Sequence, residues 1–122
     1  MTAKVQLAIP NTRALPVLFT PTPHAAKRFV TFFTANIRNP NTRKAYTWAV
    51  AEFAAWCERH GLLSLPAIEP VHVATYVESL KGHLSPPSIK QHLAAIRMLF
   101  DWLVVGQVLP SNPASSVRGP KY

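Results

Sequence analysis

The sequence predicts an all-α domain, and three observations support this. Apolar residues recur every three or four positions in four segments, each segment starts near a capping residue or a proline, and no segment alternates apolar and polar residues over a useful length. The chain has 122 residues, of which 48% are hydrophobic, so it can bury one core but is hardly long enough for two domains. We therefore expect a single bundle of four helices.

The first helix is expected over residues 23–36, because Thr22 can cap it and Pro23 suits the first helical position. Phe32 lies off the apolar stripe of this helix, which consists of Ala26, Phe29, Val30, Phe33 and Ile37. The second helix is expected over residues 41–59, after the turn-and-cap sequence 39–42 and before Gly61. Its buried stripe consists of Tyr46, Val50, Phe53 and Cys57.

The third helix is expected to start near Pro70, with Glu69 close to its positive end, and to end near Lys81. The fourth helix is expected to begin at Ser85 and Pro86 and to end before Gly106. Its apolar residues repeat every three or four positions and are Ile89, Leu93, Ile96, Phe100 and Leu103.

The prolines divide the chain into three parts. Residues 1–22 are expected to be a flexible, Pro-rich leader, because four prolines by position 23 interrupt any periodic pattern. Residues 23–110 are expected to form the helical domain. Residues 111–122, with further prolines and glycine, are expected to be a linker toward a further domain.

The charge balance is strongly basic and predicts a polyanionic partner. Lys and Arg total 13 against 5 Asp and Glu, a formal net charge of +8, and nucleic acid is the partner that such a surplus favours. The single cysteine cannot form an internal disulfide. No apolar run approaches the roughly 20 residues of a membrane span. We expect a soluble, cytoplasmic domain without a membrane partner.

Little in the sequence points to catalysis. No two of the five acidic residues are placed as a catalytic pair, and 4 glycines form no phosphate-binding loop. The pair Cys57 and His60 has the spacing of a metal site, but Cys57 falls on the apolar stripe and His60 in the last helical turn. We interpret them as a core thiol and an exposed histidine. No metal, cofactor or small-molecule ligand is expected.

Basic residues at the start of the second helix are more informative. Arg38, Arg43 and Lys44 lie there, where positive charge opposes the helix macrodipole. A phosphate would reverse the sign of that interaction, because free backbone N–H groups and the basic side chains would converge on it, and Thr42 would add a hydroxyl donor. A solvated group of charges that only serves solubility explains this feature equally well.

The outward face of the fourth helix gives a second indication. Gln91 can pair with adenine and Arg97 with guanine or phosphate, while Ala94 lets a helix approach a groove closely. An ordinary solvent face, with an ion pair between Arg97 and Asp101 four residues on, explains the same spacing equally well.

Three motifs together resemble the tyrosine recombinases, or phage integrases. They are residues 41–46 (NTRKAY) followed by 53–57 (FAAWC), residues 85–100 (SPPSIKQHLAAIRMLF) and residues 112–114 (NPA). The resemblance covers residues from about 24 to 121. It implies the N-terminal core-binding domain of that family, a SAM-like bundle of four or five helices that binds double-stranded DNA through its second and fourth helices.

The resemblance also implies roles for individual residues. The expected backbone contacts are Thr42, Arg43 and Lys44, and the expected major-groove contacts are Ser88, Lys90 and Gln91, with Arg97 as a further contact. Phe29 and Phe32 on the first helix are expected to contact other protomers on DNA. The family's catalytic residues lie in a second domain that this sequence does not contain, so we expect no enzymatic activity from this chain.

Two other functions are compatible with the pattern. A helical protein–protein interaction module could dock through Phe29, Phe32 and Phe33, its basic charge serving solubility. A helix-turn-helix repressor is disfavoured because the fourth helix is too long for a typical recognition helix.

Overall fold

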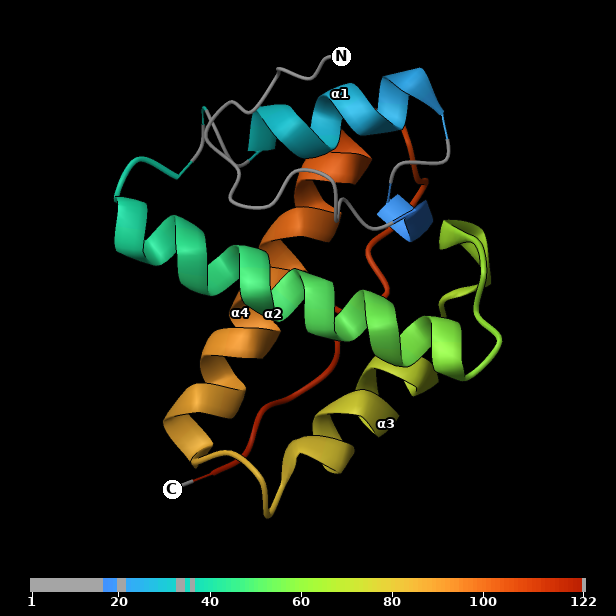
Figure 1. Ribbon diagram of the computed structural model, residues 1–122. Helices are drawn as coiled ribbons and strands as arrows, with labels where there is room; N and C mark the ends of the chain where they lie inside the picture. The colour runs from blue at the N-terminus through green and yellow to red at the C-terminus, as the bar shows by residue number, and fades with distance from the viewer. Residues whose placement is uncertain (1–16, 20–21, 33–34, 36, 122) are drawn as a thin grey trace.

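The computed structural model describes residues 17–19, 22–32, 35 and 37–121, and the regular elements in these ranges are helices, without any strand (Figure 1). The α-helices are α1 (Pro23–Thr31), α2 (Pro40–Arg59), α3 (Pro70–Leu80) and α4 (Pro86–Val105), with short 3-10 turns η2 (Val17–Phe19) and η4 (Leu65–Ala67). The all-α class predicted from the sequence is confirmed. Within the described ranges, no helix is both long and apolar enough to cross a membrane.

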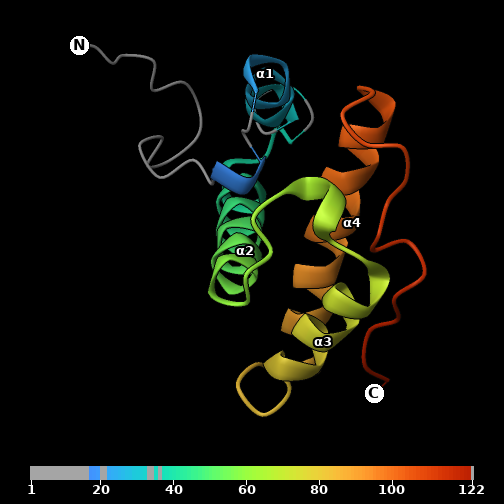
Figure 2. The same ribbon diagram turned by 90° about the vertical axis from the view of Figure 1, so that its right-hand side faces the viewer.

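Helix α4 is the centre of the bundle. Helix α2 crosses one side of it, the segment after residue 107 runs along the opposite side, α1 lies near its C-terminal end, and α3 packs beside it (Figures 1 and 2). This position explains why eight side chains of α4 are buried: Ile89, His92, Leu93, Ala95, Ile96, Leu99, Phe100 and Leu103.

The helices begin where local capping chemistry dictates. The Thr22 hydroxyl accepts a hydrogen bond from the Ala25 N–H at 3.0 Å, and the Ser85 hydroxyl accepts one from the Ser88 N–H at 3.4 Å. The Asn39 side chain accepts from two N–H groups in the first turn of α2, at 2.9 and 3.1 Å. Gly61, with a φ of 77°, adopts the left-handed conformation just after α2 ends. The expected caps are therefore confirmed, and α2 starts one residue earlier than predicted.

Aromatic rings fill the space between α2, α3 and α4. Phe53 is fully buried, and its ring centroid lies 5.0 Å from Tyr76, 6.3 Å from Phe100 and 6.4 Å from Trp56. These ring pairs come from three helices, so they fix the helices relative to one another. Val50, Phe53 and Cys57 are buried as predicted, whereas Tyr46 is half-buried at the edge of the core.

Helix α1 is fastened to the C-terminal end of α4 by a reciprocal pair. Arg28 donates to the Trp102 carbonyl at 3.1 Å, and the Trp102 indole donates back to the Arg28 carbonyl at 3.1 Å. The guanidinium carbon also lies 4.4 Å from the centroid of the indole ring, a cation–π distance. This contact places a positive charge near the negative end of the α4 macrodipole.

The structure corrects the predicted first helix in two ways. Regular α-helix ends at Thr31, after which Phe32 and Ala35 are π-helical, in line with a helical segment that continues toward residue 36. The buried alanine is Ala25, with Ala26 only half-buried. Phe32 is buried against Trp102, with ring centroids 6.4 Å apart, so it belongs to the core. The side chains of Val30 and Phe33 lie outside the described residues, and Ile37 is buried as predicted.

Both predicted domain boundaries also change. Leu18 and Phe19, assigned to the leader, are buried, and the Phe19 ring stacks on Phe29 with centroids 5.9 Å apart. At the other end, Ala114 and Val117 are buried although they were assigned to the linker. The packed domain therefore includes residues on both sides of the predicted range 23–110.

Candidate nucleic-acid interface

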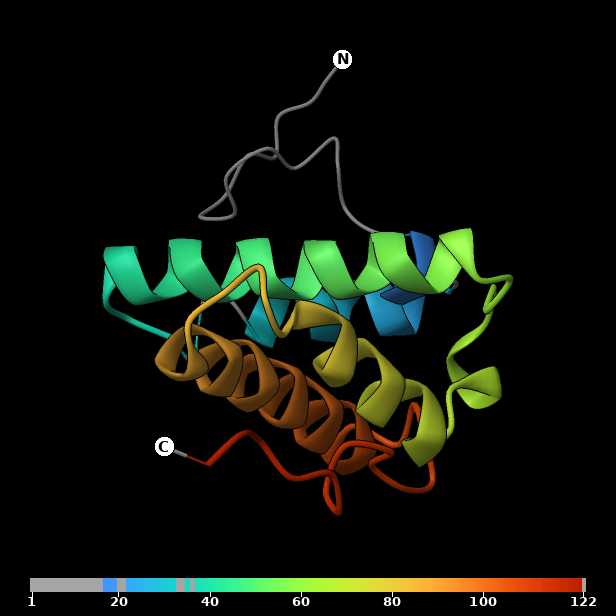
Figure 3. The ribbon, with the colours of Figure 1, turned by 90° about the horizontal axis from the view of Figure 1, so that it is seen from below.

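Helices α2 and α4 begin on the same side of the bundle, at the left in Figures 1 and 3. Neither helix has an acidic residue in its first turn, and no Asp or Glu occurs in residues 37–51 or 82–100. We call this side, with the cations Arg38, Lys44 and Lys90, the basic side. The positive ends of two macrodipoles and three side-chain cations therefore act there without a carboxylate from the same segments.

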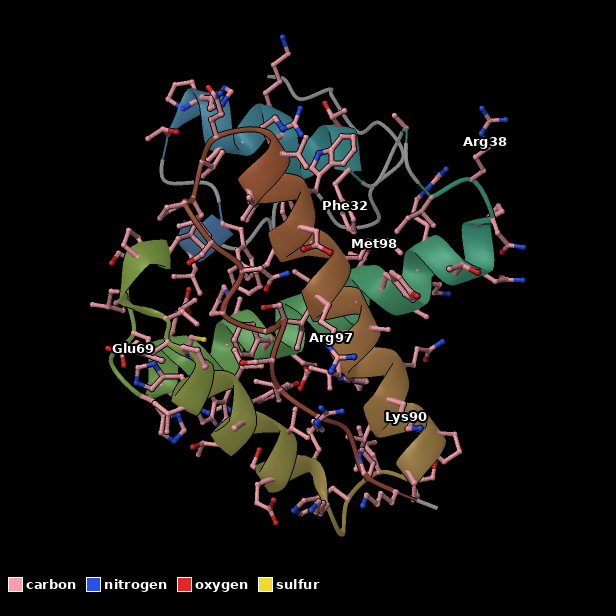
Figure 4. All side chains as sticks on the ribbon, turned by 180° about the vertical axis from the view of Figure 1, so that it is seen from behind. Phe32, Arg38, Glu69, Lys90, Arg97 and Met98 are labelled. Atoms are coloured by element: carbon pink, nitrogen blue, oxygen red, sulfur yellow. The ribbon has the colours of Figure 1, made fainter. Side chains whose placement is uncertain are left out.

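On α2, the predicted contacts differ in how exposed they are. Thr42 and Lys44 are exposed, as is Arg38, which projects away from the body of the molecule (Figure 4). Arg43 is half-buried, and its Nε and Nη2 donate to the Ile37 carbonyl at 3.0 and 2.7 Å. Arg43 therefore holds the residues before α2 against the first turns of that helix.

On α4, Lys90 and Gln91 are exposed and Ser88 is half-buried. Lys90 runs close to the returning C-terminal segment, since a Cβ built on Gly119 would lie 3.3 Å from Lys90 Cγ. Consecutive helical residues point about 100° apart, so Lys90 and Gln91 lie on adjacent parts of the exposed face of α4. The Ser88 hydroxyl lies 3.1 Å from that of Ser85, at the first turn of the helix.

Arg97 does not belong to this surface. Its Nε donates to the Ala114 carbonyl at 3.3 Å and its Nη2 donates to the Val117 carbonyl, so the half-buried guanidinium holds the C-terminal segment on α4 (Figure 4). The expectation of a DNA contact at Arg97 is corrected by this placement. Both acceptors are carbonyls of the C-terminal segment, and the spacing of residues along α4 does not predict where that segment lies.

Asn112 completes the attachment of this segment. Its Nδ2 donates to the Arg97 carbonyl at 3.0 Å and to Asp101 Oδ1 at 2.8 Å, and its Oδ1 accepts from the Ala114 N–H at 2.7 Å. Asp101 is thus bonded to Asn112, in place of the pair with Arg97 that the spacing allowed. The motif at residues 112–114 has a structural role on the back of α4.

The expected protomer contacts on α1 are also corrected. Phe29 is 1% exposed and Phe32 is 0% exposed, so neither side chain offers a surface to another chain. The alternative function as an interaction module that docks through these rings loses its support, and Phe33 lies outside the described residues.

Cys57 and His60 behave as their positions on α2 predict. Cys57 is buried, and desolvation raises the pKa of its thiol to about 12. His60 stacks on Trp56 with ring centroids 4.2 Å apart, and its Nδ1 lies 2.8 Å from the Trp56 carbonyl. Within the described residues, no group of three or more His, Cys, Asp or Glu side chains could hold a metal ion.

No periodic signal in the sequence singles out Trp48, yet it is an exposed large apolar side chain on the helix that carries Lys44. It is 53% exposed, one helical turn after Lys44, and its ring meets His92 of α4 edge-on at 5.2 Å. The sequence feature that could have identified Trp48 is its position on the polar face of the helix, where exposed polar residues are usual.

His92 is expected to make stability depend on pH. Burial lowers its pKa below the ordinary value near 6.5, an effect that the Glu52 charge partly opposes. Below about pH 6.5, His92 therefore binds a proton in the unfolded chain but stays neutral in the folded chain. The free energy of unfolding consequently falls as the pH drops from about 6.5 toward the folded-state pKa, by at most about 1.4 kcal/mol per pH unit. Urea unfolding of the parent chain and of His92→Gln at about pH 7 and 5 measures this. An equal loss in both proteins would contradict it.

Comparison with known proteins identifies related sequences. The family model of the phage integrase N-terminal SAM-like domain matches residues 24–108. A tyrosine recombinase XerC of Salmonella typhi is 33% identical over 84 residues, which cover 68% of this chain and 28% of the relative. A tyrosine recombinase XerC of Pseudomonas putida is 27% identical over 101 residues, covering 78% of this chain and 34% of the relative. No solved structure matches the chain.

Proposed function

Because the chain belongs to the family of phage integrase N-terminal SAM-like domains, we propose that it binds duplex DNA through its basic side, as the DNA-binding module of a tyrosine recombinase. The supporting observation is the separation of charge. Arg38 and Lys90 lie on one side of the molecule, whereas Glu69 lies on the opposite side (Figure 4). A phosphate backbone is attracted to the first side and is not repelled there by carboxylates from the helix starts.

The contacts on α2 are backbone contacts in this proposal. Arg38 and Lys44 neutralise phosphates, and the Thr42 hydroxyl donates to a phosphate oxygen. Arg43 acts indirectly, because its guanidinium fixes the connection that carries Arg38.

The contacts on α4 differ in kind. Gln91, with its amide donor and acceptor, reads a base edge in the major groove, where paired hydrogen bonds distinguish adenine. Lys90 and Ser88 are the further major-groove contacts of this helix, and the Lys90 charge also attracts the neighbouring phosphates. Gln91 therefore carries sequence preference, and Lys90 carries affinity for any sequence.

The chain spans about a third or less of the curated relatives' length. We infer that the whole protein exchanges DNA strands at specific sites, consistent with the recombinase names of those relatives, and that this N-terminal module contributes binding and not chemistry. Double-stranded DNA and further protomers on the same DNA are the partners of that reaction.

Salt dependence is the direct test of the proposal. If Arg38, Lys44 and Lys90 each neutralise one phosphate, the logarithm of the binding constant should fall against the logarithm of salt concentration with a slope of roughly −3. Fluorescence anisotropy of a labelled duplex, titrated with the chain at several salt concentrations, gives this slope. A slope near zero, or no binding at low salt, would refute the proposed function.

A further inference from the structure

A pocket of about 320 Å³ opens between α2, the C-terminal half of α3 and the loop that follows α3. Along α2 its wall is formed by Trp48, Glu52, Trp56 and Arg59, which succeed one another at helical spacing. Tyr76 from α3 and His92 from α4 line it from the other helices. Its size is at the small end of the range for ligand pockets.

Two residues that line this pocket have polar atoms buried beneath its surface. The Tyr76 hydroxyl and His92 Nδ1 are buried and have no hydrogen-bond partner among the residues that the structure describes. Both side chains are more than nine-tenths buried, at 3% and 4% exposure. Both atoms are shielded from solvent, so the polar groups that an occupant of the pocket can reach are the exposed side chains of Glu52 and Arg59.

The walls define the chemistry of that ligand. The indole rings of Trp48 and Trp56 offer aromatic surface, the Glu52 carboxylate accepts hydrogen bonds and the Arg59 guanidinium donates them. A phosphate is disfavoured because Glu52 repels it. An aliphatic group is disfavoured because it would cover the Glu52 and Arg59 side chains without offering them a hydrogen bond. A flat heteroaromatic ring with donors and acceptors on its edge satisfies both requirements.

Two residues that line the pocket are close in sequence to the predicted DNA contacts. Trp48 lies one turn after Lys44 on α2, and His92 follows Gln91 directly on α4. A duplex bound as proposed would therefore present its bases close to the exposed Trp48 ring. Stacking on such a ring is tolerant of base identity, because every base has an aromatic face.

We propose that this pocket holds a single unstacked nucleobase, with its face against Trp48 and its polar edge toward Glu52 and Arg59. This inference rests on the proposed function, which supplies the DNA. The same chemistry would also accept a free nucleoside, so the two sources have to be distinguished by experiment.

The test compares two duplexes of the same sequence, one fully paired and one with a single extra, unpaired thymine. The parent chain is expected to bind the second about tenfold more tightly, within the range that base–aromatic stacking provides. Trp48→Ala should abolish this preference while leaving affinity for the paired duplex within about twofold, and Trp48→Phe should retain most of it. Val105→Ala, which trims another exposed apolar side chain on α4, is the matched control and should keep the full preference.

Free thymidine at millimolar concentration identifies the source. Competition by thymidine for the unpaired-base duplex, with a shift of the Trp48 indole N–H in nuclear magnetic resonance spectra, would show that a free nucleoside suffices. No competition together with a preference for the unpaired base would show that the base must come from bound DNA.

The inference is overturned if the parent chain binds both duplexes equally, or if Trp48→Ala keeps the preference. Binding of the paired duplex with the expected salt dependence would then leave the proposed function intact. Failure to bind either duplex would instead refute the proposed function.

Discussion

The double variant Arg38→Glu/Lys44→Glu is expected to bind duplex DNA about 100-fold more weakly than the parent chain at about 0.1 M salt. Each lost phosphate contact lowers the binding constant by about tenfold at that salt concentration, because one fewer counterion is released. Both side chains are exposed, and neither is assigned to the core, so the fold should be preserved. Anisotropy titrations that also give the salt slope, which should become less steep by about 2, measure the effect.

A matched control separates position from net charge. The double variant Lys27→Glu/Lys81→Glu changes the total charge by the same amount, but it alters exposed cations on α1 and directly after α3. We expect it to weaken binding only a few-fold, through the general field of the protein. If both double variants weakened binding equally, DNA would be attracted by net charge alone and the basic side would not be the interface.

Arg97→Met is expected to lower the free energy of unfolding by about 2–3 kcal/mol, because hydrogen bonds from a charged donor to two carbonyls are lost. Those carbonyls belong to Ala114 and Val117, and the Arg97 carbonyl itself accepts from Asn112, so the whole C-terminal segment would loosen from α4. Urea unfolding monitored by circular dichroism measures the change. The segment also contains the exposed Arg118, and Arg118→Met should shift stability by no more than about 0.5 kcal/mol.

The same variant discriminates between the two roles considered for Arg97. Under conditions where the variant is folded, the slope of DNA binding against salt should match that of the parent chain, since the guanidinium is occupied within the protein. A slope less steep by about 1, together with unchanged stability, would instead mean that Arg97 contacts phosphate.

The parts of the fold that the sequence predicts well are those decided by short-range chemistry. Thr22, Asn39 and Ser85 act on N–H groups only two or three residues ahead, so the helix starts can be predicted from neighbouring residues. Gly61 ends α2 by adopting a positive φ, which is again a local property. Periodicity identifies the buried face of α4 because that face repeats over five turns.

The parts that the sequence does not predict depend on contacts between distant segments. Leu18 and Phe19 lie in a single 3-10 turn, which is too short to produce a periodic pattern. Arg97 finds its acceptors 17 and 20 residues away, and spacing along one helix says nothing about them. In the same way, helical spacing predicts that Lys44 and Lys90 are exposed, but it cannot show that Trp48, Tyr76 and His92 line one pocket.

The reversal of the chain after α4 has a consequence for where the domain can be cut. Gln107 adopts a φ of 63° and the Val108 N–H bonds back to the Leu103 carbonyl, so the chain returns along α4 toward the start of that helix (Figure 2). Arg118 and Lys121 are thereby carried back toward the neighbourhood of Lys90, and Gly119 lies beside it. A fragment trimmed at residue 110 would keep all four α-helices, yet it would lose these two cations and both of the acceptors that Arg97 requires.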